Sequence, residues 1–128
     1  MDEVISSLMQ SSVRSVGMDD SVAQVESALA NQRLNWVPVL ESTRDEAVGV
    51  ISTLDIVTFH AQGRDVSAVK AWQLCTYKPV TVDAATPLSR VAALMLECGV
   101  QHVVVTDHGK LAGVASAMDF VRTFLAAR

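Results

Sequence analysis

Short apolar runs alternate with segments of helical periodicity along the chain, and the same order of elements occurs twice. Two apolar runs stand close together in each half of the sequence, as expected for the two strands of a hairpin. These runs are WVPVL (36–40) and AVGVIS (47–52) in the first half, and HVVVT (102–106) and LAGVAS (111–116) in the second. Ahead of each pair, apolar residues recur at helical spacing, which predicts an amphipathic helix. The inward-facing positions are Val22, Val25, Ala28 and Leu29 in the first half, and Leu88, Val91, Ala92 and Met95 in the second.

The two halves are copies of one unit. A shift of 66 residues aligns Val37 with Val103, and the shift becomes 64 beyond the hairpin loop, where the first copy has two more residues. Each copy has the order β-α-β-β-α, which predicts an α/β (α+β) fold of two repeats, residues 1–62 and 63–128. One small sheet cannot bury its apolar face alone. We therefore expect the repeats to pack face to face about a pseudo-two-fold axis, with a cleft between them suited to a small ligand.

Capping residues set the predicted ends of the first helix in each repeat. In the second repeat, Thr86 is the expected N-cap, with Pro87 in the first turn and Gly99 at the end. In the first repeat, either Asp20 or Ser21 takes the capping position. These signals place both helices directly before the predicted hairpins.

The remaining segments are assigned from their polarity and turn residues. A short helix is expected after each hairpin, ending near Phe59 and near Phe124, and His108-Gly109 is expected to form a tight turn. Residues 60–70 are expected to be a polar connector between the repeats. The cysteines and four of the methionines are expected to be buried apolar side chains. These are Cys75, Cys98, Met9, Met18, Met95 and Met118.

The composition indicates a folded protein and argues against nucleic acid and membrane partners. Of 128 residues, 50% are hydrophobic and 19% charged, whereas a disordered chain would be richer in charge. Ten basic against 14 acidic side chains give a net charge of −4, and 5% aromatic residues leave little for stacking on bases. No apolar run approaches the ~20 residues of a membrane span. The acidic start at residues 1–3 is unlike a secretory signal, and the two cysteines offer no disulfide framework, so a cytoplasmic location is expected.

A Ser-x-x-Asp motif follows the last strand of each repeat and is the most specific chemical feature. It comprises Ser52 and Asp55 in the first repeat, and Ser116 and Asp119 in the second. A carboxylate in the first turn of a helix can accept the two hydroxyls of a ribose, close to free backbone N–H donors. The glycines of the preceding strands, Gly49 and Gly113, would allow a flat base to approach. The same spacing is also that of a capping box, which needs no ligand.

Basic residues that could contact a phosphate gather in the second repeat. They are Lys78, His102 and Arg122, whereas the first repeat has Trp36 at the position of His102. Residues 1–64 carry 4 basic and 9 acidic side chains, and residues 65–128 carry 6 and 5. The second half is therefore the better place for an anionic ligand, unless these groups are only solvated surface charges.

Signals for catalysis are weak. GVAS is followed by Ala and lacks the final Gly of a nucleophile elbow, and no Gly-rich phosphate loop occurs. The three histidines fall at no metal-ligand spacing. We therefore expect neither an enzyme nor a metal site.

The two copies end in GVISTLDI and GVASAMDF, each preceded by an apolar strand, and together they resemble the tandem cystathionine-β-synthase (CBS) domain pair, or Bateman module. The resemblance implies a regulatory module that binds adenosine compounds such as AMP, ADP, ATP or S-adenosylmethionine, with no obligatory cofactor, and that forms a homodimer. It implies that Asp55 and Asp119 take the ribose hydroxyls and that Ser52 and Ser116 lie beside the ribose or phosphate. It implies that the base lies against these residues in site one: Val13, Ser15, Val37 and Pro38. The counterparts in site two are Lys78, Pro79, Val80, Thr81, Val103 and Val104.

Two hypotheses of different class follow from the sequence. The first is an adenosine-nucleotide sensor in which site two, with His102 and Arg122, is the better site, and in which the ligand changes the arrangement of repeats or of the dimer for a regulated partner. The second is a ligand-free dimerisation or scaffold module whose clefts are filled by its own side chains. Trp36 in the first repeat suits that second hypothesis.

Overall fold

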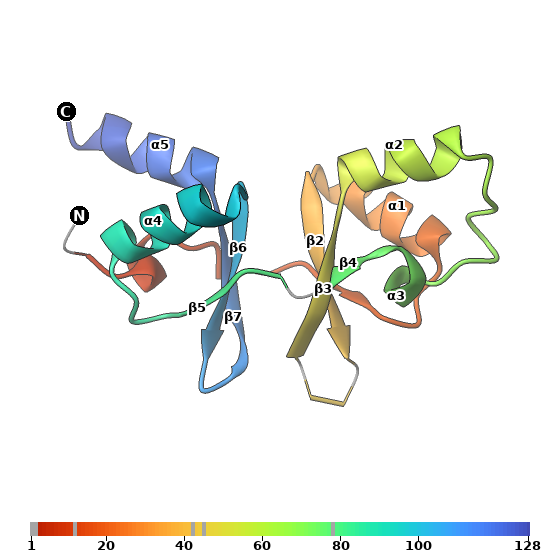
Figure 1. Cartoon of the computed structure of the whole chain (residues 1–128), viewed down its shortest axis with the longest axis horizontal. Helices are drawn as coiled ribbons and strands as arrows, with labels where there is room; N and C mark the ends of the chain where they lie inside the picture. The colour runs from red at the N-terminus through yellow and green to blue at the C-terminus, as the bar shows by residue number, and fades with distance from the viewer. Residues whose placement is uncertain (1–2, 12, 42, 45, 78) are drawn as a thin grey trace. The chain divides into compact units, whose positions relative to one another are not determined.

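The computed structural model describes residues 3–11, 13–41, 43–44, 46–77 and 79–128. The chain divides into two compact units (Figure 1). The first unit in the sequence is Arg14–Pro79, and the second combines Val80–Arg128 with the described part of Met1–Val13. Each unit therefore contains the body of one repeat together with the short segment that precedes the other repeat in the sequence.

The unit Arg14–Pro79 has one sheet with two longer helices on one side of it (Figure 1). Its described elements are β1 (Val16–Gly17), α1 (Val22–Gln32), β2 (Trp36–Glu41), β3 (Glu46–Ser52), α2 (Thr53–Ala61), α3 (Ala71–Leu74) and β4 (Thr76–Tyr77). The strand order is β1-β2-β3-β4, with β1 parallel to β2 and the other neighbours antiparallel. The predicted β-α-β-β-α order is confirmed, and α3 and β4 extend it.

The second unit repeats this plan. Its described elements are a 3-10 turn, η1 (Ile5–Ser7), β5 (Thr81–Asp83), α4 (Leu88–Cys98), β6 (His102–Asp107), β7 (Lys110–Ser116) and α5 (Ala117–Ala126). The strand order is β5-β6-β7, again with one parallel and one antiparallel pair. The pairing register also repeats, because Trp36 lies opposite Ser52 in one hairpin and His102 lies opposite Ser116 in the other. The mixed α+β fold with an internal duplication is thus confirmed.

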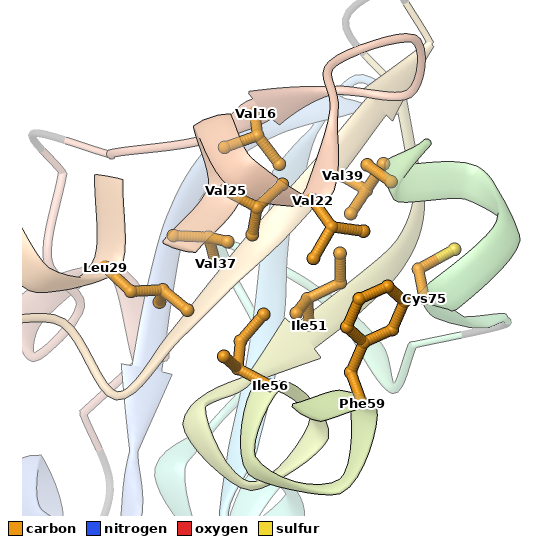
Figure 2. Close-up of a cluster of buried hydrophobic side chains, with 11 residues drawn as sticks. Val16, Val22, Val25, Leu29, Val37, Val39, Ile51, Ile56, Phe59 and Cys75 are labelled. Atoms are coloured by element: carbon orange, nitrogen blue, oxygen red, sulfur yellow. The ribbon is translucent and has the colours of Figure 1, made fainter. Parts of the chain in front are cut away.

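Each unit has its own hydrophobic core between its helices and its sheet. In the unit Arg14–Pro79, valine and isoleucine side chains of α1, β2 and β3 surround Phe59 of α2, which is completely buried (Figure 2). In the other unit the core is built from α4, α5, the sheet and Ile5 of η1. The predicted inward faces of α1 and α4 are confirmed, with Ala28 and Ala92 only partly buried at their margins.

The helix ends follow the predicted capping residues with one correction. Ser21 caps α1, since its hydroxyl accepts from the N–H of Gln24 and the Gln24 side chain accepts from the Ser21 N–H. The prediction of Thr86 as N-cap of α4 was wrong, because Pro87 takes that position in an extended conformation without a side-chain cap. The Thr86 carbonyl instead accepts from the Ile5 N–H at 2.8 Å, which ties this turn to the N-terminal segment.

The predicted turn signals agree with the backbone. Gly99 ends α4 with φ 65°, and His108 and Gly109 both have positive φ (52° and 80°) in the turn between β6 and β7. Two adjacent positive φ values are typical of the tight turns that match the twist of a hairpin.

The connector of residues 60–70 and two predicted core side chains differ from expectation. Val66 and Val69 of the connector are partly buried against the core, and their carbonyls accept from the first N–H groups of α1. Cys75 is buried as predicted, whereas Cys98 is exposed and Met118 is 54% exposed. Both exceptions lie near helix ends or on the outer face of α5, where no element of the same unit covers them.

Candidate functional site

The two Ser-x-x-Asp motifs form the N-termini of α2 and α5, and both are capping boxes. The N–H of Ser52 donates to Asp55 Oδ2 at 2.8 Å, and the N–H of Asp55 donates to the Ser52 hydroxyl at 3.2 Å. The corresponding distances for Ser116 and Asp119 are 2.9 and 3.3 Å. The capping function is therefore present in both repeats. Any ligand must use the carboxylate oxygens that the cap leaves available.

The two carboxylates differ in their remaining contacts. Asp119 is buried (8% exposed), and its Oδ1 accepts from the side-chain amide of Gln10 at 3.3 Å and lies 3.7 Å from the guanidinium of Arg122. Asp55 is only half-buried, and among the described residues no side chain except Ser52 hydrogen-bonds it. The Oδ1 atom of Asp55 is thus the more available acceptor.

The residue that faces each motif across the hairpin differs in chemistry. His102 of β6 lies opposite Ser116 and is half-buried, and burial lowers the pKa of its imidazole, an effect partly opposed by the nearby charge of Asp119. At pH 7 His102 is therefore mainly neutral and would contact a phosphate as an N–H donor rather than as a cation. Trp36 takes the same position in the first hairpin and has no comparable charge.

The predicted base-contacting strand residues are buried in their sheets. Val37 and Val103 belong to the two hydrophobic cores, so only their backbone groups could meet a ligand. Pro38 and Val104 are buried but lie on the other face of their strands, since side chains alternate between faces. Their side chains therefore lie outside the two hydrophobic cores, although both are fully buried.

The other predicted residues are distributed over both units. Ser15 is exposed just before β1, and Val80 and Thr81 lie at the start of β5. Val13 and Pro79 belong to the compact unit other than the one that holds the rest of their predicted sets. Lys78 lies outside the described residues. One unit therefore brings together His102, Ser116, Asp119 and Arg122, and the other brings together Ser52 and Asp55.

The proposed role of the two strand glycines was wrong. A Cβ atom at Gly49 would lie 2.6 Å from the Thr76 carbonyl oxygen and 2.7 Å from Cys75 Sγ. At Gly113 it would lie 2.6 Å from Met9 Sδ and 2.9 Å from the Gln10 carbonyl oxygen. The glycines are needed because a segment of the same unit crosses the strand there, and that segment covers the face a base was expected to approach.

Gln10 is a site residue that the sequence reasoning missed. The 66-residue shift also aligns Gln10 with Thr76, ahead of the predicted elements of each repeat. The structure supports that extension, because Gln10 bridges to Val114 as Thr76 pairs with Val50. The equivalence of Gln10 and Thr76 is therefore the sequence signal that marks this segment as part of the repeat.

Within the described residues, no group of three or more His, Cys, Asp or Glu side chains is placed to hold a metal ion. In that same part of the chain, every helix is too short or too polar to cross a bilayer.

Related proteins have been identified by sequence. The chain is 27% identical over 86 residues to the uncharacterized protein MK0525 of Methanopyrus kandleri, a match spanning 66% of this chain and 44% of that protein. It is 23% identical over 115 residues to the uncharacterized protein YlbB of Bacillus subtilis, spanning 90% of this chain and 78% of that protein. The chain thus spans less than half the length of the first of these relatives.

Solved structures share the fold at low sequence identity. The protein CBSX2 in complex with AMP is 24% identical with a TM-score of 0.83, and the match covers 98% of both chains. The CBS domain of a bacterial CNNM/CorC family Mg²⁺ transporter in complex with ATP is 16% identical with a TM-score of 0.86, covering 96% of this chain and 87% of that one. The CBS domain pair of MJ0100, in complex with 5′-methylthioadenosine and S-adenosyl-L-methionine, is 18% identical with a TM-score of 0.84 and full coverage of both chains.

The family model for the CBS domain matches the sequence twice, at residues 5–61 and 69–126. The first match runs from the start of η1 to the end of α2, and the second runs from just before α3 to the end of α5. The chain belongs to the CBS domain family and is a tandem pair of CBS domains.

Proposed function

We propose that this chain is a regulatory module that binds an adenosine nucleotide (AMP, ADP or ATP) at the N-termini of α2 and α5. The observation that carries the proposal is the pair of capped carboxylates, each at a helix start that combines a ribose acceptor with the positive end of a helix dipole. Asp55 supplies the most available acceptor, since its Oδ1 atom has no side-chain partner among the described residues.

The proposed contacts divide the ligand into three parts. Asp55 and Asp119 accept the ribose hydroxyls, while Ser52 and Ser116 keep these carboxylates oriented through the capping boxes. The base lies against the segments and strands predicted from the sequence. The residues proposed there are Val13, Ser15, Val37 and Pro38 for one site, and Pro79, Val80, Thr81, Val103 and Val104 for the other. His102, Arg122 and Lys78 are the proposed phosphate contacts of the second site.

The ligand class is supported by what the structural neighbours bind. CBSX2 was solved with AMP, the transporter domain with ATP, and MJ0100 with two other adenosine compounds. Adenosine is the part common to these ligands. We favour a phosphate-bearing ligand here, because Arg122 is exposed beside Asp119 and His102 lies across the hairpin from Ser116.

We further propose that the module is a homodimer. Large apolar side chains are exposed along the outer faces of α2 and α5, where a monomer would leave them in water. They are Leu54 and Val57 on α2, and Met118, Val121 and Leu125 on α5, each 52–70% exposed. A groove of about 450 Å³ between α1 and α2 lies next to Val57. A two-fold dimer would bury the same helix face on both copies.

The dimer is tested by sedimentation of the wild-type chain and of a Val57→Glu, Val121→Glu double variant. We expect wild type to sediment as a dimer and the variant as a monomer, because a buried unpaired carboxylate on each helix opposes association. Dimeric behaviour of the variant would assign the interface to other surfaces.

In the proposed mechanism, ligand binding favours one arrangement of the repeats or of the copies, and a regulated partner recognises that arrangement.

Nucleotide binding is tested by calorimetric titration of AMP, ADP and ATP into the wild type and into Asp55→Asn and Asp119→Asn. These substitutions keep the shape of the side chain but weaken acceptance of two hydroxyls. The matched control is Gln24→Ala, which alters the capping box of α1 where no ligand is proposed. We expect binding to weaken at least tenfold in one Asp variant and to persist in the control.

The alternative is a ligand-free dimerisation module. It is favoured by one observation, the complete set of intramolecular partners around Asp119. Absence of heat with all three nucleotides, in a chain shown by mass spectrometry to carry no copurified nucleotide, would support that alternative.

A further inference from the structure

The carboxylate of Asp119 accepts three hydrogen bonds from groups of its own unit. Its Oδ2 accepts from the Ser116 N–H at 2.9 Å and from the Ser116 hydroxyl at 3.2 Å. Its Oδ1 accepts from the Gln10 amide at 3.3 Å and lies 3.7 Å from Arg122. A carboxylate offers about four acceptor directions, and three of them accept hydrogen bonds here, so a ligand hydroxyl that approaches Oδ1 competes with the Gln10 amide.

Gln10 is the donor that can leave at the smallest cost to the fold. Its backbone is fixed to β7, since its N–H donates to the Val114 carbonyl at 2.8 Å and its carbonyl accepts from the Val114 N–H at 3.1 Å. Its side chain is exposed and has no other hydrogen bond among the described residues. The amide can therefore rotate into solvent without movement of the backbone, whereas the Ser116 groups belong to the helix cap.

The other unit lacks this competitor. Thr76 occupies the position of Gln10 there, paired with Val50 of β3, and its shorter side chain makes no hydrogen bond to Asp55. The capping boxes have matching distances, so the difference arises outside them, from Gln10 and from Arg122. The two carboxylates are thus presented to solvent in different states.

We infer that Gln10 is a specificity-determining residue of the second site, because its amide competes with a ribose hydroxyl for Oδ1 of Asp119. The inference rests on the proposed nucleotide function and deepens it. This competition lowers the affinity of the Asp119 site below the affinity that its proposed phosphate contacts alone would give. It also makes binding depend on a ligand hydroxyl that can replace the Gln10 amide. A ligand without that hydroxyl leaves Gln10 in place.

The test uses the full chain with Asp55→Asn as background, so that calorimetry reports the second site. Into this background we introduce Gln10→Met, which keeps the length of the side chain and removes the amide donor. Thr76→Val is the matched control at the equivalent position of the other unit. AMP, 2′-deoxy-AMP and 3′-deoxy-AMP are titrated into each variant.

We expect Gln10→Met to bind AMP about fivefold more tightly than the background, since one competing hydrogen bond to a charged group is removed. Thr76→Val is expected to leave the AMP affinity unchanged. The gain from Gln10→Met should be lost for whichever deoxy analogue lacks the competing hydroxyl, a result that a purely structural role of Gln10 would not produce.

Three outcomes would overturn the inference, and they can be told apart. Unchanged AMP affinity in Gln10→Met, with binding abolished by Asp119→Asn, would remove the competition but leave the proposed function intact. Weaker binding in Gln10→Met would make Gln10 a direct ligand contact. No binding of AMP to the wild type or to any variant would remove the proposed function and the competition together.

Discussion

The Asp55 and Asp119 sites share the same helix start but differ in their surroundings. Their capping distances agree within 0.1 Å, yet Asp119 is 8% exposed with two further partners while Asp55 is half-buried with none among the described residues. The difference comes from Arg122, three residues further along α5, and from Gln10, 109 residues away in the sequence. Duplication has preserved the local cap, whereas the contacts of the remaining carboxylate oxygen, Oδ1, are set by residues outside the motif.

The two cores show the same division between preserved backbone and changed side chains. Phe59 of α2 is completely buried, whereas its counterpart in α5 is Thr123, whose hydroxyl bonds to the carbonyl of Asp119. The sizes are reversed at the start of the two segments that pair with β7 and with β3. Ile5 is completely buried in one of these segments, where the other has the smaller Ala71. Each unit thus has one large and one small side chain at these two equivalent positions. The large one belongs to α2 in the unit Arg14–Pro79 and to η1 in the other unit.

Truncation of Phe59 is expected to give the largest effect and to sharpen this comparison of cores. Phe59→Ala should lower the free energy of unfolding by about 3–5 kcal/mol, because the cavity is lined by Ile51, Cys75 and other buried side chains that cannot collapse fully (Figure 2). Urea unfolding of the variant measures this change. The control is Thr58→Ala, an exposed neighbour on α2, for which a change within about 0.5 kcal/mol is expected.

A loss below about 1 kcal/mol for Phe59→Ala would contradict the core assignment. It would mean that Ala71 and its neighbours move to fill the cavity. The exchange of large and small residues between the units would then contribute nothing to the free energy of unfolding.

The strand glycines compare the two crossing segments directly. Gly49→Ala should lower the free energy of unfolding by about 2 kcal/mol, since the new Cβ would meet the backbone oxygen of Thr76 at 2.6 Å. Gly113→Ala should cost about half as much, because the nearest atom there is the flexible Met9 sulfur and the Gln10 oxygen is 2.9 Å away. Urea unfolding of both variants tests the order. Equal or reversed costs would show that the N-terminal segment is held as rigidly as β4 or more so.

The sequence was sufficient to predict the parts of the fold that depend on local pattern. The duplication, both hairpins, the inward faces of α1 and α4, Gly99 and the His108-Gly109 turn follow from periodicity and turn chemistry, which act over a few residues. The Ser-x-x-Asp spacing also identified the helix starts of α2 and α5 correctly.

Contacts between distant segments could not be predicted in the same way. The pairing of β4 with β3, and of Gln10 with Val114, joins a segment that precedes one repeat to the sheet of the other. No periodicity in residues 3–11 or 69–77 indicates such an exchange. For the same reason, Gly49 and Gly113 were predicted to make room for a ligand base, and the hydrogen bond from Gln10 to Asp119 was not predicted.

The smallest expected effect concerns pH and distinguishes the hairpin of His102 from that of Trp36. Burial holds the pKa of His102 below its usual value, so the folded state binds fewer protons than the unfolded state as pH falls through the unfolded value near 6.5. The contribution of neutral His102 to the free energy of unfolding is therefore fully present above that pH. It decreases as the pH falls from about 6.5 toward the lower pKa of the folded state. His102→Gln, which cannot titrate, should show a flatter change in unfolding midpoint between pH 7.5 and 5.5 than the wild type. Gln101→Ala, at an exposed neighbouring residue that does not titrate, is the control and should keep the wild-type slope. If His102→Gln and wild type lose stability equally, other groups account for the acid sensitivity, and the two hairpins do not differ in this property.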